Sequence, residues 1–160
     1  MLLEINARMG DPEAEVVFPR IESDFVSLSE AMLDGTLNRR RLDLNDTSFC
    51  TISVTQGPTN SGLPGWPYGE YDRGHLVTGL DCVDTSQCRL FIGQATVVPG
   101  RGLTTDGGRV AQVCGFDETM AGAVENAYAN VGHLDFEGIR YRTDIGRILP
   151  WDDGPATKEA

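Results

Sequence analysis

The first residues of the chain place a carboxylate, an amide and a guanidinium in one row. Residues 2–8 alternate apolar and polar side chains, which is typical of a half-buried strand. Glu4, Asn6 and Arg8 would therefore point to the same face. Carboxylate and amide oxygens are hard ligands that suit Mg²⁺, and a guanidinium can neutralise the charge of a phosphoryl group in transfer. The row predicts either a site for a metal and a phosphate or a solvent-exposed strand face.

Two more carboxylates follow in a loop at residues 10–13. Asp11 and Glu13 can orient an ammonium or amine substrate. The alternative is that Asp11 and Pro12 form a turn and that Glu13 caps the segment after it. The residues favour neither interpretation over the other.

A third group with chemical potential is the Gly107-Gly108-Arg109 turn. Its backbone N–H groups and the Arg109 guanidinium could bind an anionic ligand. Gly-Gly pairs are also typical of hairpin loops that bind nothing, and this alternative is the more common one. Arg109 is kept as a candidate substrate-binding residue.

Two helices are expected to support these groups. Ser23 or Asp24 can cap a helix whose apolar residues begin at Phe25, and Gly35 can end it. Asp117 or Thr119 can cap a second helix, which should stop near Gly132. The apolar residues of the second helix share one face: Met120, Val124, Ala127, Tyr128 and Val131.

The middle of the chain has the period-two pattern of strands, interrupted by turn-forming residues. The expected strands cover residues 49–55, 75–80, 89–97, 109–116 and 139–142. A Gly and Pro cluster separates the first two of them at residues 57–69. Several short strands of this kind indicate a small barrel or sandwich.

Composition narrows the class of protein. The 160 residues carry a formal net charge of −11, which disfavours nucleic acid and anionic lipid as partners. Apolar runs such as residues 90–92 are far shorter than a membrane span, and the N-terminus lacks a basic secretory region. We therefore expect a cytoplasmic protein whose four cysteines are reduced and do not bind zinc.

Four segments in order resemble phosphoribosylamine–glycine ligase, also called glycinamide ribonucleotide synthetase, of the ATP-grasp superfamily. Residues 3–13 with 16–20 resemble the end of its ATP-grasp domain. Residues 71–80 resemble its Tyr-x-Lys-Gly-x-x-Ile-x-Gly-Leu segment, and residues 105–110 its Thr-Asn-Gly-Gly-Arg-Val turn. Residues 136–146 resemble its closing Phe-x-Gly-x-x-Tyr-Arg-x-Asp-Ile-Gly segment.

The chain departs from the family pattern at a few positions. Ala14 and Glu15 stand where the family usually has Thr-Gln, Arg73 replaces a usual Lys, and Asp106 replaces a usual Asn. Such changes affect details of substrate contact and leave the expected fold unchanged.

The resemblance implies an α+β fold in two parts. Residues 1–45 would be the C-terminal end of an ATP-grasp domain, with its metal-binding strand and one helix. Residues 46–150 would form a small β-barrel-like C-terminal domain with a packed helix, and residues 151–160 a polar tail.

The resemblance also implies an activity. The family joins glycine to 5-phosphoribosylamine in purine biosynthesis with release of ADP and phosphate, and is thought to form glycyl phosphate first. Within that scheme Glu4 and Asn6 would hold Mg²⁺ or Mn²⁺ near the ATP phosphates. Arg8 would be the catalytic cation facing the transferred phosphoryl group, and Asp11, Glu13 and Arg109 weaker substrate-binding candidates.

The length of the chain predicts an incomplete enzyme. The family binds ATP largely upstream of the residues that this chain matches, and the sequence contains no phosphate-binding loop. We therefore expect no ligase turnover from the chain alone, and we expect it to need the N-terminal portion of the enzyme. The alternative is a non-catalytic docking module that completes an ATP-grasp cleft.

A more distant alternative is a nuclease. Residues 72–75 read Asp-Arg-Gly-His, which is also a signature of His-metal-finger nucleases. The acidic charge is unsuited to DNA, and the ligase resemblance accounts for the same residues together with their neighbours up to residue 80.

Overall fold

The computed structural model describes residues 5, 7–58 and 69–146. The chain separates into two compact units, Met1–Thr47 and Ser48–Ala160. Each unit is described by itself below. In the part of the chain that the structure describes, no helix is both long enough and apolar enough to cross a membrane.

The first unit is built from short helices. Its elements are α1 (Ala14–Val17), the 3₁₀ turns Phe18–Arg20 and Leu37–Arg39, and α2 (Phe25–Leu33). The predicted cap of α2 is confirmed, because Asp24 Oδ1 accepts a hydrogen bond from Val26 N at 3.0 Å. Gly35, with φ of 64°, follows the end of the helix, as the sequence predicts.

The expected N-terminal strand is not present in the residues that the structure describes. Ile5 lies outside any strand, and Ala7 and Arg8 form a bend. The rest of that prediction, including Glu4 and Asn6, lies outside the described residues. Alternation over seven residues is a weak signal, because a strand also needs a neighbouring strand to pair with.

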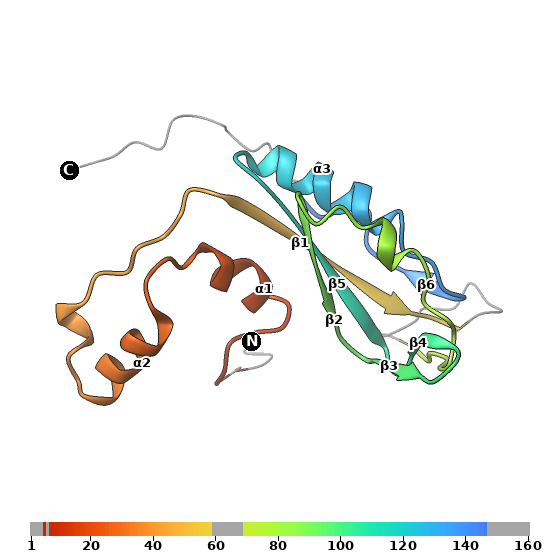
Figure 1. Cartoon of the computed structure of the whole chain (residues 1–160), viewed down its shortest axis with the longest axis horizontal. Helices are drawn as coiled ribbons and strands as arrows, with labels where there is room; N and C mark the ends of the chain where they lie inside the picture. The colour runs from red at the N-terminus through yellow and green to blue at the C-terminus, as the bar shows by residue number, and fades with distance from the viewer. Residues whose placement is uncertain (1–4, 6, 59–68, 147–160) are drawn as a thin grey trace. The chain divides into compact units, whose positions relative to one another are not determined.

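The second unit contains a four-stranded antiparallel sheet with the strand order β2-β5-β1-β6 (Figure 1). The strands are β1 (Ser48–Gln56), β2 (Cys88–Ile92), β5 (Arg109–Asp117) and β6 (Ile139–Arg140). The central pair β1 and β5 runs in register from Ser48 opposite Asp117 to Val54 opposite Ala111. The predicted strands 49–55 and 109–116 are confirmed.

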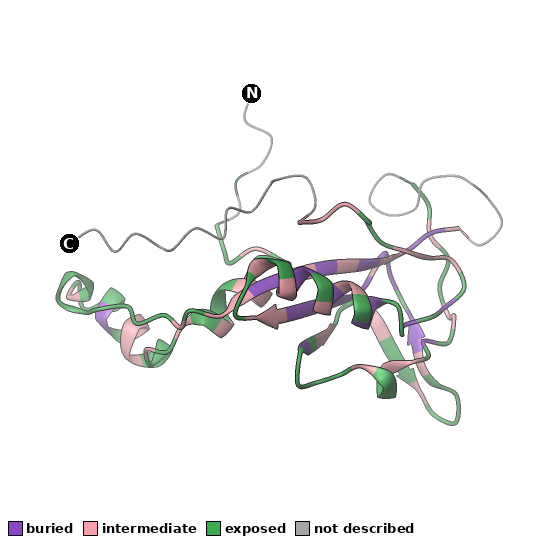
Figure 2. Ribbon diagram, turned by 90° about the horizontal axis from the view of Figure 1, so that it is seen from above, coloured by how far each residue is buried: buried purple, intermediate pink, exposed green. Residues whose placement is uncertain are grey.

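Helix α3 (Met120–Val131) covers one face of this sheet (Figure 1). Thr119 caps it, accepting a hydrogen bond from Gly122 N at 3.0 Å, as the sequence predicts. Gly115 permits the close approach, because a Cβ at this position would lie against Ala123 O and Ala127 N of the helix. The residues coloured as buried gather on the helix and the sheet where the two meet (Figure 2). They include Cys50, Ile52, Val54, Val113, Ala123, Ala127 and Val131.

A separate two-stranded sheet adjoins the pocket described below. It pairs β3 (Ala95–Val98) with β4 (Gly102–Thr105). The expected single strand at residues 89–97 is therefore wrong: it divides at residues 93–94 between two sheets. Gly93 marks the division, because a Cβ there would lie 2.7 Å from Arg109 O.

Two further expectations need correction. Residues 75–80 form no strand, because their bridges go to different partners, Leu76 to Thr104 and Thr78 to Asp135. The expected strand at 139–142 is reduced to two residues. The described residues also form no closed barrel: four strands are too few to close around a core, and α3 covers one face of the open sheet instead.

Candidate functional site

Three of the four segments that resemble the ligase family meet in the second unit. The segment at residues 71–80 runs beside β4, with Gly74 N donating to Thr105 O at 2.7 Å and Thr105 N donating to His75 O at 2.8 Å. His75 N also donates to Thr105 Oγ1 at 3.2 Å. These backbone hydrogen bonds join the segment at residues 71–80 to the segment at residues 105–110, which lies about thirty residues further along the sequence.

The segment at residues 136–146, together with Asp135 just before it, also contacts the segment at residues 71–80. Thr78 N donates to Asp135 O at 2.9 Å, and the Thr78 hydroxyl donates to the same oxygen at 3.1 Å. His75 Nδ1 lies 3.3 Å from Glu137 Oε2. The Gln56 side-chain amide, which is buried, donates to Glu137 O at 2.7 Å. These bonds fix the segment at 136–140 against the end of β1.

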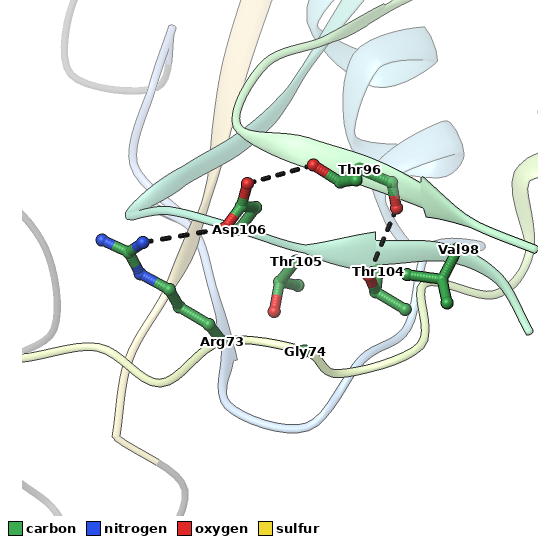
Figure 3. A pocket seen from close by; sticks show the side chains of 7 residues that line it. All are labelled: Arg73, Gly74, Thr96, Val98, Thr104, Thr105 and Asp106. Atoms are coloured by element: carbon green, nitrogen blue, oxygen red, sulfur yellow. Dashed lines mark hydrogen bonds and ion pairs between the residues drawn. The ribbon is translucent and has the colours of Figure 1, made fainter.

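A pocket of about 300 Å³ opens where residues 73–74 pass the β3–β4 pair (Figure 3). Its lining includes three threonines and one pair of opposite charges. The lining residues are Arg73, Gly74, Thr96, Val98, Thr104, Thr105 and Asp106. Gly74 has a φ of 80°, a conformation that a side chain would strain.

The charged pair stands at the exposed part of this pocket. Arg73 Nη1 lies 3.6 Å from Asp106 Oδ1, and the two side chains are 61% and 55% exposed. The guanidinium also lies 5.6 Å from the centre of the Tyr71 ring, and Arg73 Nη2 donates to the Tyr71 hydroxyl at 3.4 Å. Arg73 is therefore held by several weak contacts.

Asp106 is held more firmly than Arg73. The Thr96 hydroxyl donates to Asp106 Oδ2 at 3.0 Å, and Asp106 N donates to Gln94 O at 3.0 Å. The Thr104 hydroxyl in turn donates to Thr96 O at 3.2 Å (Figure 3). The carboxylate thus stands on a hydrogen-bonded support that spans both strands of the β3–β4 pair.

The Gly107-Gly108 turn has a packing role. It is no hairpin loop, since β4 and β5 belong to different sheets and the turn carries the chain from one to the other. A Cβ on Gly107 would collide with the side chain of Gln94, and Gln94 Oε1 accepts a hydrogen bond from Arg109 N at 3.0 Å. This backbone N–H is therefore already satisfied by the protein.

Of the predicted site residues that the structure describes, none is among those that line this pocket. Arg8, Asp11 and Glu13 belong to the first unit, where all three are exposed. Arg8 Nη1 donates to the neighbouring Met9 O at 2.7 Å. Residues 11–13 form the turn of the alternative interpretation, although Glu13 precedes α1 without making a side-chain capping bond.

Arg109 is half-buried at the start of β5 and is not among the residues that line the pocket. Glu4 and Asn6 lie outside the described residues. The residues at 5, 7–58 and 69–146 include no group of three or more His, Cys, Asp or Glu side chains able to hold a metal ion.

Sequence reasoning missed Thr96, Thr104 and Thr105 as pocket residues. The strand β4 that carries two of them was not predicted, so nothing brought them opposite residues 73–74. The sequence did contain one signal for this pocket. Arg73 and Asp106 each lie in a family motif, and each differs from the residue type that is usual there.

Comparison with known proteins decides the family. A family model described as phosphoribosylglycinamide synthetase, C domain, matches residues 62–148, which is more than half of the chain. The chain belongs to this family. The matched range includes residues 72–75, so the ligase family accounts for the Asp-Arg-Gly-His sequence that also suggested a nuclease.

Curated relatives carry the name of the whole enzyme. The chain is 34% identical over 149 residues to a phosphoribosylamine–glycine ligase of Fusobacterium nucleatum, covering 92% of the chain and 33% of the relative. It is 33% identical to a bifunctional purine biosynthetic protein of Dictyostelium discoideum, covering 91% of the chain and 17% of that protein. The chain thus spans about a third, or less, of the length of these relatives.

A solved structure agrees with these relatives. The crystal structure of phosphoribosylamine–glycine ligase from Thermotoga maritima matches with a TM-score of 0.61 and 26% sequence identity. The match covers 90% of this chain and 33% of the Thermotoga chain. The mixed α/β fold is therefore shared with part of that enzyme.

Proposed function

We propose that the chain is the C-terminal part of a phosphoribosylamine–glycine ligase, which joins glycine to 5-phosphoribosylamine with conversion of ATP to ADP and phosphate. The observation that carries this proposal is that two family segments, residues 71–80 and 105–110, line one pocket in a chain that matches the family's C domain. Purine biosynthesis in the cytoplasm is the setting that this activity implies.

The first unit would supply the phosphoryl-transfer chemistry. Glu4 and Asn6 offer a carboxylate and an amide oxygen, a donor set that suits Mg²⁺ or Mn²⁺. Bound there, the metal would neutralise ATP phosphate charge. Arg8, exposed on the surface of its unit, would turn its guanidinium toward the transferred phosphoryl group.

The remaining two thirds of the enzyme are needed for turnover under this proposal. The relatives are about three times as long as the part that the chain matches. The first unit also exposes large apolar side chains such as Leu33, at 88%, and Val26, at 65%. Exposed apolar groups of this size are typical of surfaces that another part of the protein covers.

The test is a complementation assay. ADP formation that depends on both glycine and 5-phosphoribosylamine would be measured with this chain alone, and with the chain mixed with an N-terminal portion of the family enzyme. We expect turnover only in the mixture, and we expect Glu4→Ala in this chain to abolish it. Turnover by the chain alone would contradict the proposed need for the N-terminal portion.

A docking role without catalytic residues is the second candidate, and the exposed apolar side chains of the first unit favour it. The same assay separates the two. Under the docking role, Glu4→Ala and Arg8→Ala leave turnover of the mixture unchanged, while omission of the chain removes it. Under the ligase proposal, each substitution reduces turnover by about a hundredfold or more.

A further inference from the structure

We propose that Asp106 is an internal counter-ion that competes with an anionic ligand for Arg73, and that the pocket between residues 73–74 and the β3–β4 pair admits a phosphate monoester only against this competition. The choice of a phosphate monoester as ligand class rests on the proposed ligase function. The competition itself rests on the geometry of the pocket.

The charges of the lining cancel. Among the seven residues that line the pocket, Arg73 is the one cation and Asp106 the one anion. A phosphate monoester carries up to two negative charges near neutral pH, so it is attracted by Arg73 and repelled by Asp106. The lining therefore offers an anion a guanidinium that is already partly neutralised.

The two partners differ in how firmly they are fixed. Asp106 is anchored through its side chain to Thr96 at 3.0 Å and through its backbone to Gln94 at 3.0 Å. Arg73 is 61% exposed and reaches Asp106 only at 3.6 Å, through one of its two terminal nitrogens. An incoming anion would consequently draw the guanidinium away, while the carboxylate would stay in the pocket.

The Thr105 hydroxyl completes a ligand site without adding charge, whereas Thr96 and Thr104 already donate their hydroxyl protons within the protein. Thr105 Oγ1 accepts a hydrogen bond from His75 N, so its own proton points to a further acceptor. Thr104 and Thr105 are both buried, and they stand beside the charged pair (Figure 3). A phosphate oxygen is the kind of acceptor that a hydroxyl and a guanidinium can share.

Asp106→Asn is the decisive variant. Asparagine keeps an oxygen that can accept from Thr96, removes the negative charge and places an amide N–H donor where the second carboxylate oxygen stood. Binding of ribose 5-phosphate to the full chain would be measured by NMR titration at low salt, because salt screens exposed charges. We expect the variant to bind about three- to tenfold more tightly than the unchanged chain.

Two controls isolate the cause. Asp144→Asn removes a negative charge from another aspartate that pairs with an arginine, Arg142, outside the pocket lining, so it should leave affinity unchanged. Arg73→Ala in the Asp106→Asn background should remove the gain. The proposal is overturned if Asp106→Asn binds no more tightly, if Asp144→Asn gives the same gain, or if the gain survives Arg73→Ala.

The same titrations separate this proposal from the ligase function. If inorganic phosphate reproduces the whole gain, the pocket is a general oxyanion site and the counter-ion role stands without the sugar ester. If the complementation assay fails while Asp106→Asn still tightens binding, the ligase function fails and the counter-ion role remains. Working complementation with no gain from Asp106→Asn overturns the counter-ion role alone.

Discussion

The two units of the chain differ in where their apolar side chains go. In the described residues of the first unit, only Ala31 is buried, while Phe25, Met32 and Leu33 on α2 are exposed. In the second unit, the helix α3 and the sheet enclose a continuous core that includes Ile52 and Val113. The second unit is therefore built to fold around its own core, whereas the first lacks such a core.

Because of this difference, the proposed catalytic residues and the buried core lie in different units. The residues proposed for metal and phosphoryl contact all belong to the unit without a core, and the pocket belongs to the unit with one. The proposed catalytic residues thus depend on other parts of the enzyme for a fixed geometry, while the pocket should keep its shape in the chain alone. Four measurements bear on this contrast.

The largest effect is expected from truncating a core residue. Ile52 is 1% exposed under α3, so Ile52→Ala should lower the free energy of unfolding of the second unit by about 2–5 kcal/mol. Leu33 is 88% exposed in the first unit, so Leu33→Ala should change the free energy of unfolding of the first unit by less than about 0.5 kcal/mol. Urea unfolding followed by circular dichroism would measure both. Equal losses would remove the distinction between the units.

The second prediction concerns alkaline pH. Burial raises the pKa of the Cys88 thiol to about 11, from an ordinary value of 9.0. The unfolded chain therefore loses this proton first, so the contribution of Cys88 to the free energy of unfolding should be constant below pH 9 and fall as the pH rises toward 11. Cys88→Ala should weaken that dependence, whereas Cys82→Ala, at an exposed residue, should leave it intact. Denaturation at a series of pH values provides the measurement.

A smaller effect is expected at the start of α3. The Thr119 hydroxyl accepts a hydrogen bond from Gly122 N, so Thr119→Ala should cost about 1 kcal/mol of stability in the second unit. Thr119→Ser retains the acceptor and is the matched control. A loss of similar size in both variants would show that the capping bond is not the cause. Thermal unfolding of the two variants makes the comparison.

The smallest effect is expected at the start of α2. Hydrogen bonds from Ser27 and from Val26 N hold the pKa of the Asp24 carboxyl below its usual value of 3.8. Its contribution to helix stability is present above that value and is lost as the pH falls through the lowered pKa. The protection of the Val26 amide, taken relative to its intrinsic exchange rate at each pH, would therefore fall on acidification below pH 4, and Asp24→Ala would show the low protection at every pH.

The strongly periodic elements could be predicted from sequence. Both longer helices and the two central strands follow from local signals, such as the capping residues Asp24 and Thr119 and the alternation around Ile52. The β3–β4 pair could not, because the interruption at Gly93 serves a close approach to Arg109 O, a contact that is distant in sequence. Residues 75–80 have the sequence pattern of a strand, but they bond to two separate segments and therefore form no strand.

The candidate site could be predicted from the sequence only in part. Family resemblance singled out the segments that contain Arg73 and Asp106, and it noted that both residues depart from the usual type. It did not show that the two face one another, because their approach depends on the register between Gly74 and Thr105. Local periodicity carries no information about a register between residues thirty positions apart.

The pairing of β1 with β5 also determines when this domain can fold during synthesis. The two central strands, Ser48–Gln56 and Arg109–Asp117, are separated by more than fifty residues that include β2, β3 and β4. Until β5 has left the ribosome, β1 lacks its long antiparallel partner, and α3, which follows β5 in the chain, cannot yet cover the sheet. A nascent chain arrested before Arg109 should therefore expose the future core strand, and that interval is when a chaperone would be needed.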